Sequence, residues 1–400
     1  MEIDRSIKYF IFISLLLFTA ILIVEKINGR FWLNDFKVFY EAAKALLANE
    51  KVYGIPFGLE TGFYKYSPFT LLFFIPFTLI PYNIASIIDF ILIASATIST
   101  IVLLVQIIRK NNGLPSPPKT ITYLLILLCV INHLVRELHL GNTNMILLLL
   151  LTLSIKLALE SKYISSSALL AITILTKPYF LICLLPYLLI KKHKSIVYVF
   201  VWLFAFVIVS GAAIGFEKSF SLYSEWVLAM KEHSTYLSSN HTLFALLSFY
   251  LGIKIPSSFG IIILVVIGIL SFAFLWLKNR MNQIEISKSK NAEQVFLLYY
   301  FILIALIPSI LITDTEHFLF SLPLIVLLFL KVKQENKFAY TIFFIVLMFL
   351  YGGNSSDLLG KSLAGKVEDW GLLGIGNLII IFVAIYLFGR QNKGAQRNII

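Results

Sequence analysis

Residues 34–44 read Asn-Asp-Phe-Lys-Val-Phe-Tyr-Glu-Ala-Ala-Lys, and residues 64–68 read Tyr-Lys-Tyr-Ser-Pro. The first of these stretches follows the first apolar run of the chain, so Asp35 stands close to where that run leaves the membrane. A carboxylate at a membrane rim is costly, and such residues tend to be well solvated or functional. Two interpretations follow. Asp35 is either a solvated N-cap for a helix over 36–48 or a residue that carries chemistry.

The composition around this stretch is that of a membrane protein. Of the 400 residues, 59% are hydrophobic and only 14% are charged, whereas soluble chains carry about 25% charged residues. A membrane span takes roughly 20 apolar residues. Thirteen apolar runs are visible, near residues 8–24, 66–80, 83–108, 120–135, 144–159, 164–175, 178–190, 195–215, 257–277, 295–312, 317–330, 338–351 and 372–388. We therefore predict an all-α integral membrane protein with many crossings.

The positive charge is distributed as expected for membrane topology. The net charge is +12, but the basic residues cluster in short loops between apolar runs, for example at Arg109-Lys110 and near Lys331 and Lys333. This pattern follows the positive-inside rule and does not form a stripe for nucleic acid. No nucleic-acid partner is expected.

The two chain ends fix the parity of the crossings. Arg5 and Lys8 predict a cytoplasmic N-terminus, and Arg390 with Lys393 predicts a cytoplasmic C-terminus. Two ends on one side require an even number of crossings. One of the thirteen runs therefore does not cross, and twelve transmembrane helices remain.

The run at 66–80 is the best candidate for the segment that does not cross. It is short, and it is bracketed by Pro68, Pro76 and Pro81, which break the helical hydrogen-bond ladder. We expect a re-entrant or interfacial segment on the outer face. The chain is then a single integral domain over 1–400 with long outer segments at 25–82 and 216–256.

Polar residues that loop solvation does not explain collect on this predicted outer face. Ionisable groups at membrane ends usually face a cavity or pair with one another. The topology was derived from basic loops alone, so this gathering is independent information, and it predicts a site at the outer membrane boundary. The residues are Asp35, Lys65, Arg136, Glu137, His139, Asn144, Lys177, His241, Asp314, Glu316 and His317.

The same region resembles glycosyltransferase family 87, the membrane mannosyltransferases of the GT-C superfamily. The resemblance covers roughly residues 30–330. It rests on Asp35-Phe36 with Tyr40 and Ala42-Ala43, on Val52-Tyr53, on Tyr66-Ser67-Pro68, on Gly141-Asn142-Thr143-Asn144, on Lys177-Pro178, on Asn240-His241-Thr242 and on His317. It implies a GT-C-type bundle, a polyprenyl-phosphate sugar as donor, Asp35 as catalytic base, and an inverting single displacement.

Sugar transfer from a lipid phosphate needs three kinds of side chain. The acceptor hydroxyl must lose a proton to a base, and the leaving phosphate needs cations or strong donors. The sugar and acceptor need polar and aromatic walls. Asp35 supplies the base. The candidates for the phosphate are Lys65, Arg136, His139, Lys177 and His317, and those for sugar and acceptor are Tyr64, Tyr66, Asn144, His241 and Glu316.

Several of these residues have structural alternatives. Lys177 could be a turn lysine that snorkels to the interface. Arg136 and Glu137 could form an ion pair that ends a helix. His139 could be a hydrogen-bonded interface histidine.

Two residues depart from the family pattern. Glu316 stands where the family often has a histidine, and His241 stands where it usually has an amide. Asp314, Glu316 and His317 could also bind a hard divalent cation or cap the helix that follows. We expect no resident metal or other cofactor.

These features favour a glycosyltransferase that moves a hexose, mannose by the resemblance, to a lipid or glycan acceptor of the cell envelope. Its site would face the extracytoplasmic side of a bacterial-type plasma membrane. A transporter or flippase of a lipid-linked sugar is the alternative. That class would show polar residues at the midplane and repeated halves, whereas the polarity here is one-sided and no repeat is visible. A membrane scaffold without chemistry would leave Asp35 and the outer cations without a role.

Overall fold

The computed structural model describes residues 4–57, 62–113, 118–189, 192–236, 239–256, 259–281, 290–311, 313–353 and 355–397. Every predicted site residue lies in these ranges, whereas 58–61 and 237–238 of the predicted outer segments lie outside them. The described residues form helices and loops, with a single isolated bridge between Pro56 and Phe63. The all-α prediction is confirmed.

Five helical stretches are long and apolar enough to cross a membrane. They are α1 (Arg5–Ile27), α4 (Tyr82–Asn112), α10 (His193–Ile214), most of α14 (Lys290–Ile310), and η4 (Thr315–Ser321) with α15 (Leu322–Glu335). Two bent pairs raise the count to seven if each pair is one span: α5 (Thr120–Cys129) with α6 (Ile131–Leu140), and α18 (Lys361–Asp369) with α19 (Leu372–Arg397). The described residues therefore define a polytopic membrane protein, and the total of twelve crossings stays a prediction.

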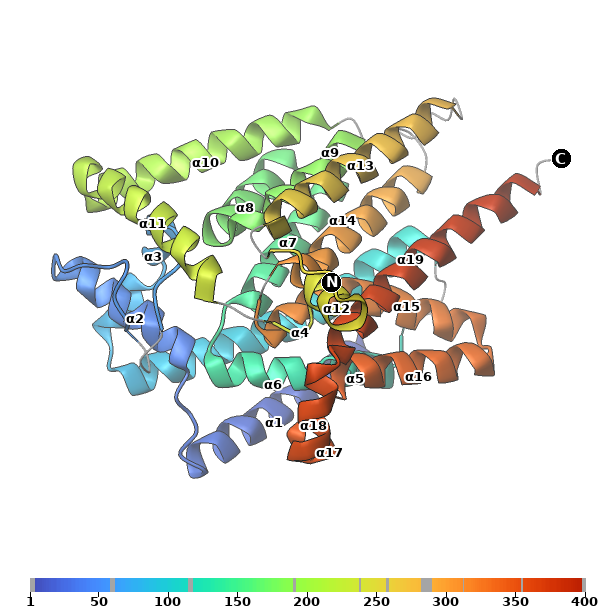
Figure 1. Ribbon diagram of the computed structural model, residues 1–400, viewed down its shortest axis with the longest axis horizontal. Coiled ribbons are helices and arrows are strands. Elements are labelled where there is room, and N and C mark those ends of the chain that lie inside the picture. Colours follow the sequence, from blue (N-terminus) through green and yellow to red (C-terminus); the bar gives the residue numbers. More distant parts are fainter. Residues whose placement is uncertain are drawn as a thin grey trace.

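The remaining helices complete the bundle. They are α2 (Asn34–Leu47), α3 (Pro68–Leu71), η1 (Ile75–Leu79), α7 (Asn144–Leu159), α8 (Tyr163–Thr176), η2 (Pro178–Leu184), α9 (Leu185–Leu189), α11 (Phe216–Tyr236), α12 (Leu243–Leu251), α13 (Phe259–Met281), α16 (Phe338–Gly352) and α17 (Ser356–Leu359). Figure 1 shows α4, α7 and α14 in the middle of the molecule, with α10 and α16 at its edges.

Burial divides the long helices into an inner and an outer group. The apolar window of α4 is 61% buried and that of α14 is 78% buried, whereas the windows of α1 and α10 are only 22% and 17% buried. Exposed apolar side chains on α1 and α10 suit contact with lipid, because lipid tails are as apolar as leucine. The inner helices pack against elements that carry polar residues of the predicted site: α14 packs against η4, which contains Glu316 and His317, and α4 packs against α7, which begins at Asn144.

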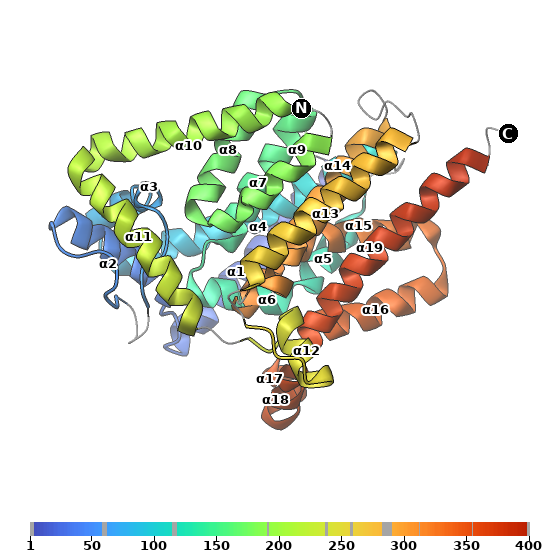
Figure 2. The ribbon, with the colours of Figure 1, turned by 45° about the horizontal axis from the view of Figure 1, so that its top comes forward.

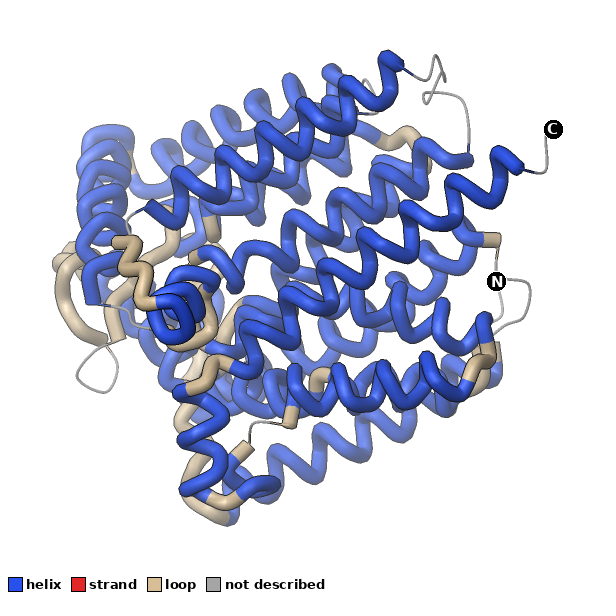
Figure 3. The backbone as a smooth tube through the Cα atoms, turned by 45° about the vertical axis from the view of Figure 1, so that its right-hand side comes forward, coloured by secondary structure: helices blue, strands red, loops and turns tan. Residues whose placement is uncertain are grey.

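The segment 66–80 consists of α3 and η1, two short pieces with prolines near their starts. Neither piece is long enough to cross a membrane, which agrees with the expected interfacial segment. Figures 1 and 2 show α2, α3 and α11 grouped together at one end of the molecule. Figure 3 shows the C-terminal end of α19 at the opposite end of the long helices, away from most of the loops.

Candidate active site

Asp35 lies in the first turn of α2 and is not its N-cap. The N-cap is Leu33, which adopts a left-handed backbone conformation with φ of 41° and provides no side-chain cap. The Tyr82 hydroxyl donates to the Leu33 carbonyl at 3.1 Å, which ties this turn to the start of α4. The Asp35 side chain is half-buried, and its Oδ2 accepts a hydrogen bond from Asn142 Nδ2 at 2.8 Å. The interpretation of Asp35 as a solvated N-cap is therefore wrong.

Burial raises the pKa of Asp35 from 3.8 to about 6, and the carboxylate of Asp314 adds to the shift. The positive charges of Lys65, Lys177 and Arg136 oppose it. These influences reach Asp35 only because the side chains lie near one another. A carboxyl with this pKa is mostly ionised at neutral pH and still basic enough to hold a proton, which suits a general base.

Arg136 and Glu316 form an ion pair across 180 residues of sequence. Arg136 Nε donates to Glu316 Oε2 at 3.0 Å; the Glu316 side chain is fully buried, whereas that of Arg136 is 52% exposed. The alternative of an Arg136–Glu137 pair is wrong. Glu137 instead accepts from Asn144 Nδ2 at 2.8 Å and from the Met145 backbone N–H at 2.9 Å, so it satisfies donors in the first turn of α7.

Lys177 points into the protein from the junction of α8 and η2. It is 6% exposed, which does not fit a lysine that snorkels to the interface. Its Nζ donates to Asn144 Oδ1 at 2.5 Å and to His317 Nε2 at 2.9 Å, and it lies 5.8 Å from the Tyr66 ring centroid. Burial lowers the pKa of Lys177, and the nearby carboxylates oppose that shift.

Of the three predicted residues at 64–66, Lys65 and Tyr66 lie within range of the Asp35 charge. Burial lowers the pKa of Lys65, and the nearby carboxylates of Asp35 and Asp314 oppose that shift. The ammonium group of Lys65 therefore belongs to the same charged cluster. The Tyr66 hydroxyl shares a hydrogen bond with Thr143 Oγ1 at 2.9 Å. Tyr64 is fully buried and donates to the Ser67 carbonyl at 3.3 Å, so it packs inside the fold and does not face the carboxylates.

His139 and His241 do not join this cluster. His139 Nδ1 lies 2.8 Å from Glu25 Oε2, beside the end of α1, and its ring is 6.0 Å from that of Trp32. His241 is 2% exposed, and its ring lies 6.1 Å from the Phe318 ring. Burial lowers the pKa of His241 to about 4, so its ring is neutral at physiological pH. Both histidines have structural surroundings of their own.

The sequence analysis did not assign a role to Asn142, which lies at the centre of the cluster. Its Nδ2 donates to Asp35 and also to Glu316 Oε1, the latter at 3.3 Å. Asn142 belongs to the polar stretch 141–144 between two apolar runs. This position was the one feature of the sequence that could have marked Asn142 as a site residue. We define the charged cluster as Asp35, Lys65, Arg136, Asn142, Lys177, Glu316 and His317.

Metal ligands are not gathered here. Throughout the part of the chain that the structure describes, no three His, Cys, Asp or Glu side chains are grouped so that they could hold a metal ion. Asp314, Glu316 and His317, which the sequence offered as ligands of a divalent cation, are therefore not arranged to bind one. The cluster contains cations of its own that could hold an anionic group.

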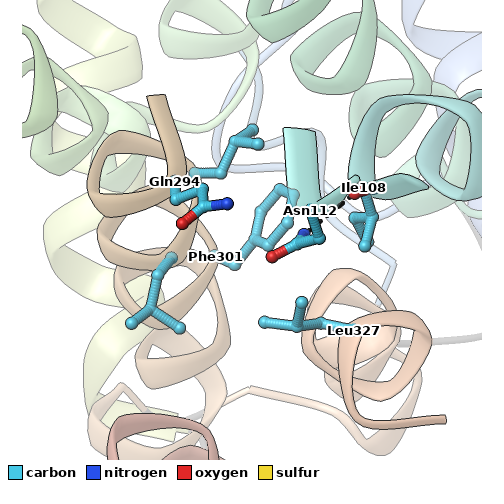
Figure 4. Close-up of a pocket in the computed structure, with 7 residues that line it drawn as sticks. Ile108, Asn112, Gln294, Phe301 and Leu327 are labelled. Carbon is cyan, nitrogen blue, oxygen red and sulfur yellow. Dashed lines mark hydrogen bonds between the residues drawn. The ribbon is translucent and has the colours of Figure 1, made fainter. Parts of the chain in front are cut away.

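A pocket lies elsewhere in the structure, away from the charged cluster. Figure 4 shows Ile108, Asn112, Gln294, Phe301 and Leu327 around a pocket between α4, α14 and α15. The Tyr82 end of α4 adjoins Leu33, and Asn112 is thirty residues further along that helix, or about 45 Å at 1.5 Å per residue. The pocket is therefore remote from Asp35.

Fold and charge together define a polytopic integral membrane protein with a charged cluster at one end of its helix bundle. The model of glycosyltransferase family 87 matches residues 63–305, and the chain belongs to that family. The match leaves Asp35, Glu316 and His317 outside its limits, so their assignment depends on geometry.

The crystal structure of ArnT from Cupriavidus metallidurans bound to undecaprenyl phosphate is 12% identical, with a TM-score of 0.36, over 95% of this chain and 78% of that one. A comparison with curated proteins found no match.

Proposed function

We propose that this glycosyltransferase transfers a hexose, mannose in the first instance, from a polyprenyl phosphate to a hydroxyl of a lipid or glycan acceptor on the extracytoplasmic side. The observation that carries the proposal is the charged cluster. It brings the Asp35 carboxylate, whose pKa is raised by burial, beside the cationic groups of Lys65, Arg136 and Lys177. A base next to several cations is what transfer from a phosphate to a hydroxyl requires.

In the proposed reaction Asp35 removes the proton of the acceptor hydroxyl. The acceptor oxygen forms a bond to the anomeric carbon while the bond from that carbon to the phosphate oxygen breaks. The electron pair leaves with the polyprenyl phosphate, and the proton stays on Asp35. A single displacement of this kind inverts the configuration of the anomeric carbon.

The cations act on the leaving group. Lys177 Nζ and His317 Nε2 lie 2.9 Å apart, so a phosphate bound beside them would contact both side chains. Arg136 is anchored through Nε to Glu316, and its guanidinium group, with five N–H donors in a planar fork, is suited to phosphate. Negative charge that develops on the phosphate would be stabilised by these donors.

The proposal is tested by a transfer assay with purified protein in nanodiscs. Radiolabelled polyprenyl-phosphate mannose is the donor, and alkyl mannosides together with a bacterial lipid extract are the acceptors. We expect time-dependent transfer of label from the lipid phosphate and none from a nucleotide sugar. Label taken from the nucleotide sugar, or no transfer above a protein-free control, would contradict the proposal.

A further inference from the structure

The Asn142 side chain lies between two carboxylates of the charged cluster, those of Asp35 and Glu316. It is 6% exposed and directly follows Gly141, the C-cap of α6. Its amide nitrogen carries two hydrogens, and the structure gives that nitrogen two acceptors, Asp35 Oδ2 at 2.8 Å and Glu316 Oε1 at 3.3 Å. Each hydrogen is directed at one carboxylate.

The orientation of this amide is determined by its other end. Asn142 Oδ1 accepts from the Thr143 backbone N–H at 2.7 Å and, more weakly, from the Tyr66 hydroxyl at 3.4 Å. A backbone N–H can only donate, so the atom facing it must be the oxygen. The reversed amide would point its oxygen at two carboxylates and its NH₂ at a donor.

This arrangement has a consequence for Asp35. One of its oxygens is held by Asn142, and among the described residues its Oδ1 accepts no hydrogen bond. Oδ1 is therefore the oxygen that an acceptor hydroxyl would meet. Glu316 is fixed in the same way, because Arg136 holds its Oε2 while Asn142 holds its Oε1. The shared amide donor also offsets repulsion between the two carboxylates.

We propose that Asn142 is a positioning residue of this enzyme: its amide holds the Asp35 carboxylate with one oxygen turned toward the acceptor and links it to the Glu316–Arg136 pair. The inference rests on the proposed role of Asp35 as general base. Asn142 itself does not touch the reacting atoms.

The first test is the pH dependence of kcat/KM in Asn142→Ala. A hydrogen bond to the ionised form favours that form, so its loss should move the acidic limb of the profile upward by about one pH unit. We expect kcat to fall about 10- to 100-fold, with the KM for the donor within about twofold of wild type. Asn142→Gln, which keeps the amide on a longer side chain, should restore part of the rate.

Asn111→Ala is the matched control. Asn111 is also a buried asparagine, and its Nδ2 donates to the Ile107 carbonyl at 2.8 Å, far along α4 from Asp35. It should leave the profile in place. An unmoved acidic limb in Asn142→Ala, or an equal shift in Asn111→Ala, would overturn the inference.

The second test needs no transfer. Thermal unfolding of wild type, Asn142→Ala, Asp35→Asn and the double variant gives a double-mutant cycle at pH 8. We expect Asn142→Ala to lower the Tm of wild type by about 2 °C more than it lowers that of Asp35→Asn. Additive effects would overturn the inference even in an active enzyme. If the coupling is present but wild type transfers no sugar, the proposed function is overturned and Asn142 still positions Asp35.

Discussion

At the scale of single residues, the protein sets the chemistry of Asp35 by burying it among cations. The folded-state pKa is raised from 3.8 to about 6, so the folded protein holds this proton more tightly than the unfolded chain does. The stability that this contributes is complete below about pH 4 and is lost as the pH rises to about 6. At neutral pH an ionised, half-buried Asp35 therefore weakens the fold.

This sign gives a first prediction. Asp35→Asn removes the titration, so its Tm should exceed that of wild type at pH 8, and the difference should disappear near pH 4. Thermal unfolding in detergent at pH 4, 6 and 8 measures it. A difference that is constant across this range would mean that folding does not raise the pKa of Asp35.

Lys177 gives a second prediction. Lys177→Met keeps an apolar stem and removes the charge next to His317. Losing a charge-assisted contact to a developing anion costs about 2–4 kcal/mol, or roughly 30- to 1,000-fold in kcat. The matched control is Lys162→Met, because Lys162 is an exposed lysine whose only described ion pair is with Glu160, and it should turn over normally. A Lys177→Met protein with the wild-type rate would remove Lys177 from the phosphate site.

At the scale of elements, the site depends on how closely α6 approaches the start of α2. Gly141 ends α6 with φ of +66°, and a Cβ at this position would lie 2.8 Å from Phe36 Cβ and 3.0 Å from Leu33 Cβ. Phe36 and Leu33 flank Asp35 in sequence. Gly141 thus allows both the turn and the close packing that bring Asn142 to Asp35.

The third prediction compares two glycines with the same backbone conformation. Gly113 ends α4 with φ of +63°, and a Cβ there would meet nothing within 4 Å. Both Gly→Ala changes strain a left-handed residue by about 1–2 kcal/mol, but only Gly141→Ala also forces α2 away. We expect Gly141→Ala to lose at least about tenfold in kcat and Gly113→Ala to keep the wild-type rate. Equal rates in both would show that this contact does not position the site.

The elements also show what sequence could and could not predict. Asp35, Lys177 and His317 were found because charged groups beside apolar runs are conspicuous. The suggested ion pair between Arg136 and Glu137 was wrong because adjacent helical residues project about 100° apart. Glu137 lies on the buried face of α6, and Arg136 does not. Asn142 was missed because its partners come from α2 and η4, and such long-range pairs leave no local pattern.

At the scale of the whole molecule, charge and hydropathy predicted a polytopic membrane protein. The number of membrane crossings depends in addition on where helices bend. The 68° bend between α5 and α6 lies inside the apolar run 120–135 and leaves that run intact, so sequence alone does not reveal it. The 54° bend between α18 and α19 lies just before the apolar run that starts at residue 372. Residues 66–80 were recognised as unusual through their prolines. The polar site at one end of the bundle was predicted from the topology, and its internal pairing was not.

The fourth prediction concerns topology. If α3 and η1 do not cross, a reporter fused after Pro81 should report the extracytoplasmic side and one after Lys110 the cytoplasm, since α4 lies between them. Paired alkaline phosphatase and fluorescent-protein fusions at the two sites measure this. A cytoplasmic signal at Pro81 with an outer signal at Lys110 would exclude the arrangement of twelve crossings.

The central claim is that Asp35 is the general base of a sugar transfer from polyprenyl phosphate. The most direct measurement is the initial rate of label transfer from polyprenyl-phosphate mannose by wild type and Asp35→Asn, together with donor binding by both. The amide is nearly isosteric with the carboxylate but does not take up the hydroxyl proton, and general-base assistance is worth about 10²–10⁴-fold. We predict a fall of that size with donor binding retained. A folded Asp35→Asn protein that keeps half of the wild-type rate would contradict the account.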